Sequence, residues 1–128
     1  MQMITHSWMK PSDSLLETFS AQSNILNQKK EALVSAYCLR TNGDHWRLML
    51  INKDPERMYK INVNIENKQS KQNIAWKPDQ MIQYSKKQYQ WIADGMNSHP
   101  KFSLPPLTRK IRPGGNIVLP PYSVTVVF

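Results

Sequence analysis

The sequence predicts an all-β protein, an antiparallel two-sheet β-sandwich of about eight strands. The first observation is a hairpin over residues 32–53, in which Asn42-Gly43 separates two apolar runs. Both turn residues tolerate positive φ, as a tight hairpin turn requires. The second observation is the clean alternation of apolar and polar residues over 58–66. The third is the regular spacing of short apolar segments between polar turns, which is typical of sandwiches.

The segment before the hairpin admits two interpretations. Residues 15–19 are predicted to form a short strand, followed by a polar connection over residues 22–31. The alternative is a helix over residues 14–26 that begins at a capping residue, Asp13 or Ser14. We favour the strand because the apolar residues match a helical period only in part.

Further strands are predicted wherever a short apolar segment lies between turn residues. They cover residues 1–5, 58–66, 74–76, 80–84, 89–92, 107–111, 116–119 and 122–128. Proline cannot donate a ladder hydrogen bond, so Pro120-Pro121 predicts a strand break or a crossing between sheets. Residues 95–106 combine Gly, Asn, Ser and Pro and are expected to form a long irregular loop.

Both sets of alternating residues in the hairpin are largely apolar, so both faces of these strands are expected to be covered. A two-layer sandwich covers only one face of each sheet. The second face therefore needs either the loop at 95–106 or another domain as its cover. The residues of this predicted interdomain packing surface are Leu33, Tyr37, Met49 and Ile51.

The composition fits one domain, residues 1–128, with a packed core. Apolar residues make up 40% of the chain, and the single cysteine, Cys38, cannot form an intramolecular disulfide. Because Cys38 lies in a predicted strand, we expect it to act as a small hydrophobic residue. No apolar run approaches the length of a membrane span. The N-terminus lacks a signal-peptide pattern, so we expect either a cytoplasmic protein or, with more weight, a piece cut from a longer chain.

The charge balance raises the question of an anionic partner. Lys and Arg outnumber Asp and Glu by 17 to 9, which gives a net charge of +8. The basic residues are dispersed, however, and form no continuous block. A solvated basic surface is therefore favoured over a nucleic-acid groove.

The titratable residues form no recognisable catalytic or metal-binding pattern. His6, His45 and His99 are far apart and lack the spacing of metal ligands. The nine carboxylates lie mostly in turns, and none combines an apolar setting with a partner that would raise its pKa. Nucleotide-binding and nucleophile motifs do not occur. The sequence predicts no catalytic residue, no metal ligand and no cofactor.

The aromatic residues of the second half suggest a carbohydrate-binding surface. The candidates for stacking on a sugar ring are Trp76, Tyr89 and Trp91. Tyr89 and Trp91 are two residues apart and share one face of an extended segment. That arrangement suits packing on the sandwich or on a neighbouring domain equally well, and packing carries more weight. Single-stranded nucleic acid, bound by these aromatics and nearby lysines, ranks third.

Several segments together resemble one known type of domain. They read TxxWMKPSDSLLETFSAQSNI, VSAYCLRTNGDHWRLMLINKDP, QYQWIADGMNSHPKFSLPP and IVLPPYSVTVVF. This order, which covers nearly the whole chain, resembles the C-terminal β-sandwich domain of bacterial TIM-barrel glycoside hydrolases of the arabinofuranosidase and endoglucanase/xylanase type. The matching residues are Ala36-Tyr37, Asn42-Gly43-Asp44, Leu48 to Asp54 and Leu119 to Val126. The closing LPPYSVTVV together with LMLINKDP is the most specific part.

The resemblance implies a non-catalytic accessory domain that packs on a TIM-barrel catalytic domain of the same parent chain. The catalytic glutamates of such enzymes lie on barrel strands, and no residue here matches them. The missing signal peptide also fits, since the parent enzyme would carry it upstream. The location is then expected to be extracellular or periplasmic if the parent is secreted. Polysaccharide is a second candidate partner, whereas a membrane and nucleic acid are not expected.

Overall fold

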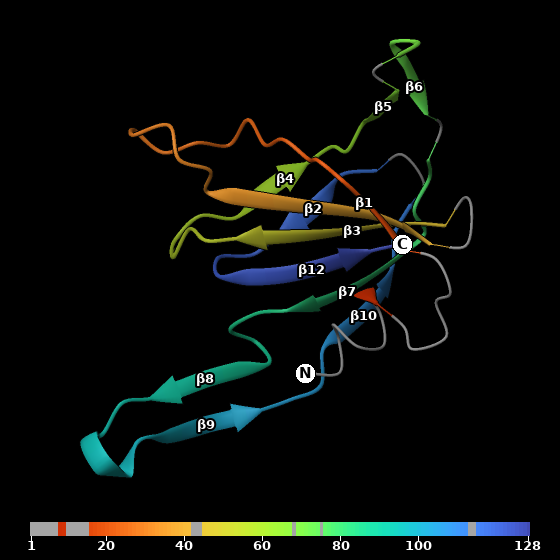
Figure 1. The fold of residues 1–128 in the computed structure, drawn as a ribbon. Coiled ribbons are helices and arrows are strands. Elements are labelled where there is room, and N and C mark those ends of the chain that lie inside the picture. Colours follow the sequence, from red (N-terminus) through yellow and green to blue (C-terminus); the bar gives the residue numbers. More distant parts are fainter. Residues whose placement is uncertain (1–7, 10–15, 42–44, 68, 75, 113–114) are drawn as a thin grey trace.

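The structure of the protein, a computed structural model, describes residues 8–9, 16–41, 45–67, 69–74, 76–112 and 115–128. These residues contain twelve strands and no α-helix, which confirms the predicted all-β class. Six strands form one antiparallel sheet, and two more form a sheet that packs against it. They make the eight-stranded sandwich that the sequence predicts, and the other four strands form two projecting hairpins (Figure 1).

The six-stranded sheet has the order β1-β2-β3-β12-β7-β10, and every neighbouring pair is antiparallel. Its strands are β1 (Leu16–Phe19), β2 (Val34–Thr41), β3 (His45–Asn52), β7 (Gln80–Tyr84), β10 (Leu107–Lys110) and β12 (Ser123–Val127). β2 and β3 pair along their whole lengths, which confirms the predicted hairpin. Its turn residues, Asn42-Gly43, lie outside the described residues.

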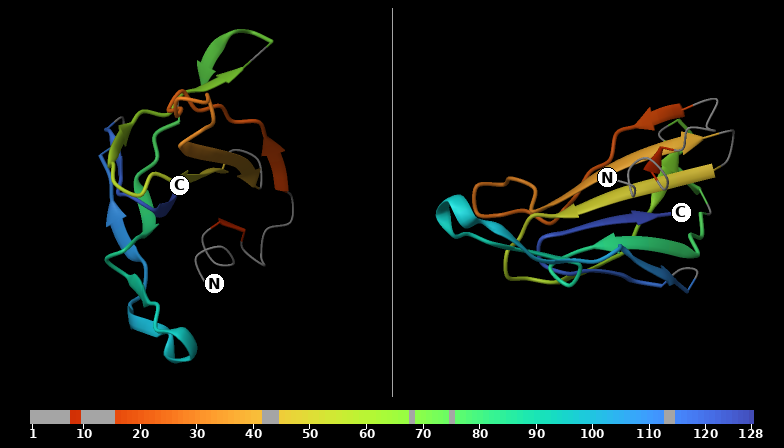
Figure 2. Two further views of the ribbon diagram at one scale, coloured as in Figure 1. Left: turned by 90° about the vertical axis from the view of Figure 1, so that its left-hand side faces the viewer. Right: turned by 90° about the horizontal axis from the view of Figure 1, so that it is seen from below.

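The smaller sheet consists of β4 (Tyr59–Ile61) and β11 (Ile117–Leu119). The two projecting hairpins are β5 (Ile65–Asn67) with β6 (Gln72–Ile74), and β8 (Tyr89–Ile92) with β9 (His99–Ser103). A 3₁₀ helix, η2 (Gly95–Asn97), joins β8 to β9. Figures 1 and 2 show these hairpins leaving the sandwich at opposite sides.

The main hydrophobic core lies between the two sheets. Alternate residues of the central strands point into it, as the period of a strand requires. Its buried members are Val34, Leu48, Leu50, Met81, Ile117, Leu119 and Val127. Tyr59, Ile61 and Trp76 pack against this cluster and are partly buried. The core therefore draws on the six-stranded sheet and on β11 alike.

Two amide side chains also tie β11 to the larger sheet. Asn52, at the end of β3, is buried and donates to the carbonyls of Leu119 and Pro120, at 3.2 and 2.8 Å. Gln83, on β7, donates to the Val118 carbonyl at 2.9 Å and to the Thr125 hydroxyl at 2.9 Å. A buried polar group is tolerated only when it is hydrogen-bonded, and these two amides are.

The second face of the large sheet is covered differently from the expectation. Trp8 packs there against Leu39, Met49 and Val126, and the Arg47 side chain donates to the Trp8 carbonyl at 2.8 Å. Residues 95–106, expected as a covering loop, instead supply η2 and β9 to a projecting hairpin. That expectation is wrong because residues 99–103 find their hydrogen-bond partner in β8.

Most predicted strands lie where the sequence places them, including β7, β8, β10, β11 and β12, each within one residue. Residues 16–19 form β1, so the alternative of a helix over 14–26 is wrong. The exposure alternates over 58–66 as predicted, but the ladder is interrupted and the segment divides into β4 and β5. The strand predicted at 74–76 is displaced to β6, and the one at 1–5 lies outside the described residues.

The adjacent prolines 120 and 121 separate strands of different sheets, as predicted. β11 belongs to the small sheet and β12 to the large one. Tyr122 follows the prolines with a positive φ of 47°, a conformation that a non-glycine residue rarely adopts. Its backbone N–H donates to the Asp54 carbonyl at 3.0 Å, which holds this turn against the β3–β4 connection.

Candidate functional site

The most prominent surface feature is the hairpin of β8, η2 and β9, residues 89–103, which we call the arm. Figures 1 and 2 show it extending away from the sandwich. A β-bulge interrupts its ladder between Gln90 and Trp91. No residue of the arm is buried, and all of β8 is exposed. The arm is therefore a two-stranded ribbon without a core of its own.

The arm is rich in apolar side chains and poor in charge. Its exposed large hydrophobic residues are Tyr89, Trp91, Ile92 and Met96, of which Trp91 is 52% exposed. Its charged residues are Asp94 and Lys101, whose charges cancel, whereas the whole chain has a net charge of +8. Aromatic residues and Met are enriched at the centres of protein interfaces, where charged residues are depleted. The composition of the arm matches that of an interface centre.

The root of the arm is fixed by hydrogen bonds. The Gln88 side-chain oxygen accepts from the backbone N–H of Ser85 at 2.8 Å and from the Ser85 hydroxyl at 3.1 Å. The Leu104 N–H donates to the Gln88 carbonyl at 2.7 Å, across the base of the hairpin. Because Ser85 and Gln88 are buried, these bonds are shielded from water and hold the arm where it leaves β7.

Two further exposed apolar side chains lie in connections beside this root. Tyr122 follows β11, and Met58 precedes β4. The Lys86 ammonium lies 5.5 Å from the Tyr122 ring centroid and 3.4 Å from the Pro55 carbonyl. The β7–β8, β11–β12 and β3–β4 connections therefore meet at one end of the sandwich. We call this surface, the arm with Met58 and Tyr122, the docking end.

Asp54 organises the β3–β4 connection at the docking end. Its Oδ1 accepts from the N–H groups of Glu56 and Arg57 at 2.9 and 3.0 Å, and its Oδ2 accepts from the Tyr59 hydroxyl at 2.7 Å. These bonds, first that from the Glu56 N–H and then that from Tyr59, lower the pKa of the Asp54 carboxyl. The same carboxylate raises the pKa of the Tyr59 hydroxyl.

We predict that this carboxylate stabilises the fold at neutral pH and ceases to do so in acid. A carboxyl with a lowered pKa contributes stability above its unfolded-state pKa of about 3.9, and loses it as pH falls through the lower folded value. Urea unfolding of wild type and Asp54→Asn should therefore converge between about pH 5 and about pH 2. Tyr59→Phe, which removes one donor, should show a smaller acid-dependent loss than wild type. An equal pH dependence of wild type and Asp54→Asn would contradict the assignment.

The three residues predicted to stack on sugar do not form one site. Tyr89 and Trp91 lie on β8 in the arm, with the Tyr89 ring 6.3 Å from that of Tyr84. Trp76 precedes β7, at the other end of that strand, and packs against the main core. The two groups are separated by the length of β7, about 15 Å for five residues. Each would have to bind a ligand by itself.

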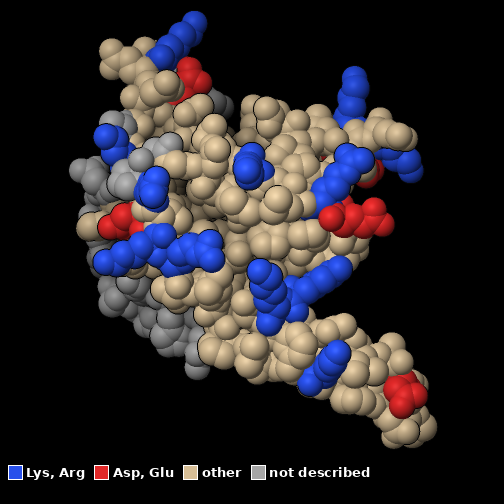
Figure 3. All heavy atoms as spheres, turned by 180° about the vertical axis from the view of Figure 1, so that it is seen from behind, with Lys and Arg blue, Asp and Glu red and all other residues tan. Residues whose placement is uncertain are grey.

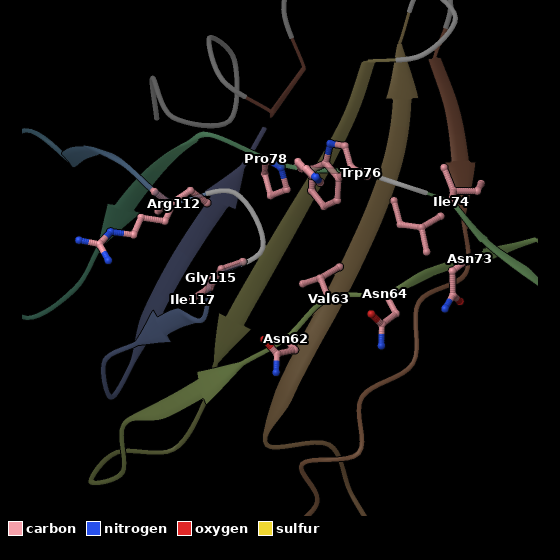
Figure 4. Close-up of a pocket in the computed structure, with 13 residues that line it drawn as sticks. Asn62, Val63, Asn64, Asn73, Ile74, Trp76, Pro78, Arg112, Gly115 and Ile117 are labelled. Carbon is pink, nitrogen blue, oxygen red and sulfur yellow. The ribbon is translucent and has the colours of Figure 1, made fainter.

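Trp76 instead lines a pocket of about 460 Å³ beside the main core. Figure 4 shows Trp76 above Val63 and Ile117 in this pocket, while Asn62 and Asn64 point away from Trp76. The side chain of Trp76 is half-buried, so its position is that of a core residue at the margin of a depression. Packing therefore describes Trp76 better than an open stacking platform.

The predicted interdomain packing residues have different surroundings. Met49 is buried beneath Trp8, and Ile51 packs half-buried against the same cluster. Leu33 precedes β2, is half-buried, and donates its N–H to the Ile25 carbonyl. Tyr37 is 53% exposed. Within this set, Tyr37 retains the surface area that a further domain would cover.

Basic residues are dispersed over the sandwich rather than collected in a groove. Figure 3 shows Lys and Arg side chains spread over the whole face seen from behind, with wide areas of uncharged surface between most of them. No helix in the described ranges is long and apolar enough to cross a membrane. Among the described residues, no cluster of three or more His, Cys, Asp and Glu side chains is suited to a metal ion. Burial raises the pKa of the Cys38 thiol, which disfavours its thiolate at neutral pH.

Comparison with models of protein families, with curated proteins and with solved structures finds no match to this chain.

Two residues of the docking end are not predicted by the sequence patterns. Met58 and Met96 are the most exposed of its apolar side chains, yet each has polar residues around it in the sequence. For Met96, the signal that could have found it is the low charge of the segment between Gln88 and Leu104.

Proposed function

We propose that this chain is a non-catalytic accessory domain of a bacterial glycoside hydrolase, which packs on the TIM-barrel catalytic domain of its parent and stabilises it. The observation that carries the proposal is the arm, a projecting hairpin with exposed apolar side chains and a hydrogen-bonded root. The resemblance of the sequence motifs to such domains supplies the identity of the partner.

Physical considerations support a docking role for the arm. A two-stranded hairpin is at best marginally stable in water unless its apolar side chains are covered. Trp and Tyr are the residues that most often dominate the free energy of an interface, because they bury large areas at small entropic cost. Trp91 and Tyr89 are placed to act in this way, and Met58 and Tyr122 extend the same surface. The proposed interface is centred on Trp91.

We predict that Trp91→Ala destabilises the parent protein but not the isolated domain. In the 128-residue chain the Trp91 side chain is half-exposed, so the substitution should change the free energy of unfolding by less than about 0.5 kcal/mol. In the parent, loss of an interface aromatic should cost about 2 kcal/mol. Denaturant unfolding of both proteins measures the difference.

Ile74→Ala is the matched control, since Ile74 is an exposed apolar residue on the other projecting hairpin. It should leave the parent unchanged. Equal effects of Trp91→Ala in parent and isolated domain would contradict a docking role. Retardation in plant polysaccharide gels that Trp91→Ala abolishes would replace docking by carbohydrate binding at the arm. Salt-sensitive retention on single-stranded DNA would favour nucleic acid.

A further inference from the structure

The second sheet leaves part of the larger sheet uncovered, and a groove of about 660 Å³ lies there. Its floor is the core-facing side of β1, β2 and β3, and residues 61–67 form the wall that faces it. The connection after β1, residues 20–25, forms a further wall. The groove is separate from the arm, which follows β7 at another part of the fold.

The floor of the groove ends in a fixed aromatic cluster. The rings of Phe19 and Trp46 are 5.0 Å apart, and the Arg40 guanidinium lies 5.4 Å from the centroid of each. Arg40 is held in place by Glu17, whose two carboxylate oxygens accept from its Nη2 at 3.0 and 2.9 Å. Phe19 is 38% exposed and Trp46 only 9%. Phe19 is therefore the accessible ring, and Trp46 and Arg40 hold it in position.

The walls of the groove are apolar toward the floor and polar at the rim, which is almost uncharged. Ile25, Ile61 and Val63 of the walls are half-buried and pack against the main core. The exposed amide and hydroxyl side chains of the rim make no side-chain hydrogen bond to any described residue; they are Ser20, Gln22, Asn24, Asn62, Asn64 and Gln69. Glu66 and Arg40 are the charged residues of the described lining, and Arg40 is already paired with Glu17. Figure 4 shows Asn62 and Asn64 on the side of the chain opposite Val63, which points toward Trp76.

These features select one class of ligand. Among the described lining residues an anion would find no uncompensated cation, since Arg40 is paired and Glu66 is acidic. A purely apolar ligand would contact the apolar interior but make no use of the amides at the rim. A neutral sugar has an apolar C–H face for the Phe19 ring and hydroxyl groups that pair with amides on either side. Small-ligand sites combine apolar area with a few polar groups in this way.

We infer that this groove binds a neutral oligosaccharide, with Phe19 as its stacking ring and Asn62, Asn64 and Gln22 as hydrogen-bonding groups. The site goes beyond the proposed docking role and does not depend on it. It also differs from a sugar site on the exposed aromatics, because none of its contacts comes from the arm.

The test is titration of the ¹⁵N-labelled chain with cellohexaose and xylohexaose, followed by amide shifts. We expect saturable shifts in residues 20–25 and 61–67 with at least one of the two sugars. Asn64→Ala, an exposed position that leaves the fold intact, should weaken binding about 3- to 10-fold through loss of a hydrogen bond. Phe19→Ala should weaken it at least as much, with unchanged circular dichroism. Asn116→Ala, an exposed amide outside the groove, is the control.

Several outcomes would overturn the inference. They are the absence of saturable shifts, shifts confined to the arm, and equal weakening by Asn116→Ala and Asn64→Ala. Preference for a hexamer of galacturonic acid over both neutral sugars would refute the neutral class. Trp91→Ala separates this test from that of docking, because it should leave sugar binding unchanged even where it destabilises the parent.

Discussion

Replacing Asn52 by Ala is expected to lower the free energy of unfolding by about 3–4 kcal/mol, because one buried amide serves both layers of the sandwich. Its Nδ2 group donates to the carbonyls of Arg57, Leu119 and Pro120, and its Oδ1 accepts from the Asp54 N–H at 3.0 Å. Asn52 is 1% exposed, so no water replaces these partners without rearrangement. Each buried group left unpaired costs about 1–3 kcal/mol. Denaturant unfolding at neutral pH measures the loss.

Asn52→Asp sharpens this prediction. The Asp carboxylate retains an acceptor for the Asp54 N–H, but its negative charge faces three carbonyl oxygens. At neutral pH Asn52→Asp should therefore lower the free energy of unfolding more than Asn52→Ala does. Protonation of the new carboxyl should restore part of the stability in acid, which an alanine cannot do. Asn116→Ala, at an exposed position, is the control. A loss below about 1 kcal/mol for Asn52→Ala would contradict the proposed bridging role.

The importance of Asn52 shows what sequence patterns do and do not reveal. By sequence it belongs to a turn, Asn-Lys-Asp-Pro, after the second strand of the hairpin. By parity it follows Leu48 and Leu50 on the core-facing side of β3, a polar residue at a buried position. That conflict is the detectable signal. Two of its three acceptors come from residues 119 and 120, and no local pattern predicts such long-range pairing.

The elements with strong local signals were predictable. The β2–β3 hairpin and the terminal strand have runs of apolar and β-branched residues, and local propensity agrees there with the tertiary structure. The first strand of the arm was predicted, but the second was not, because β9 contains Pro100, which usually argues against a strand. Pro100 is accommodated beside the bulge, in a two-stranded ribbon whose outer edge needs no further donor. Pairing with β8 decides the conformation, and pairing is not a property of the segment alone.

For the surface features, the sequence shows which residue types are present but not which of them are exposed. The sequence indicates that Trp76, Tyr89 and Trp91 are aromatic residues near turns, but exposure depends on what the rest of the chain places over them. Trp76 packs against the main core, whereas Trp91 lies on the arm and is exposed. Trp8 likewise packs on residues of β2, β3 and β12, strands that begin 26 residues later or more. The groove depends on the second sheet having only two strands, a property of the whole topology.

Leu119→Ala is expected to cost about 3 kcal/mol, because Leu119 is fully buried between the two sheets and its truncation leaves a cavity. Leu104→Ala, at an exposed leucine near the root of the arm, should change the free energy of unfolding by less than about 0.5 kcal/mol. The Leu119 carbonyl also accepts from Asn52, so the two sites share a contact. The double variant Asn52→Ala/Leu119→Ala should therefore deviate from additivity by about 0.5–3 kcal/mol. Two outcomes would contradict the packing of β11 on the large sheet. They are strict additivity of the two substitutions, and a decrease in the free energy of unfolding of less than about 1 kcal/mol for Leu119→Ala.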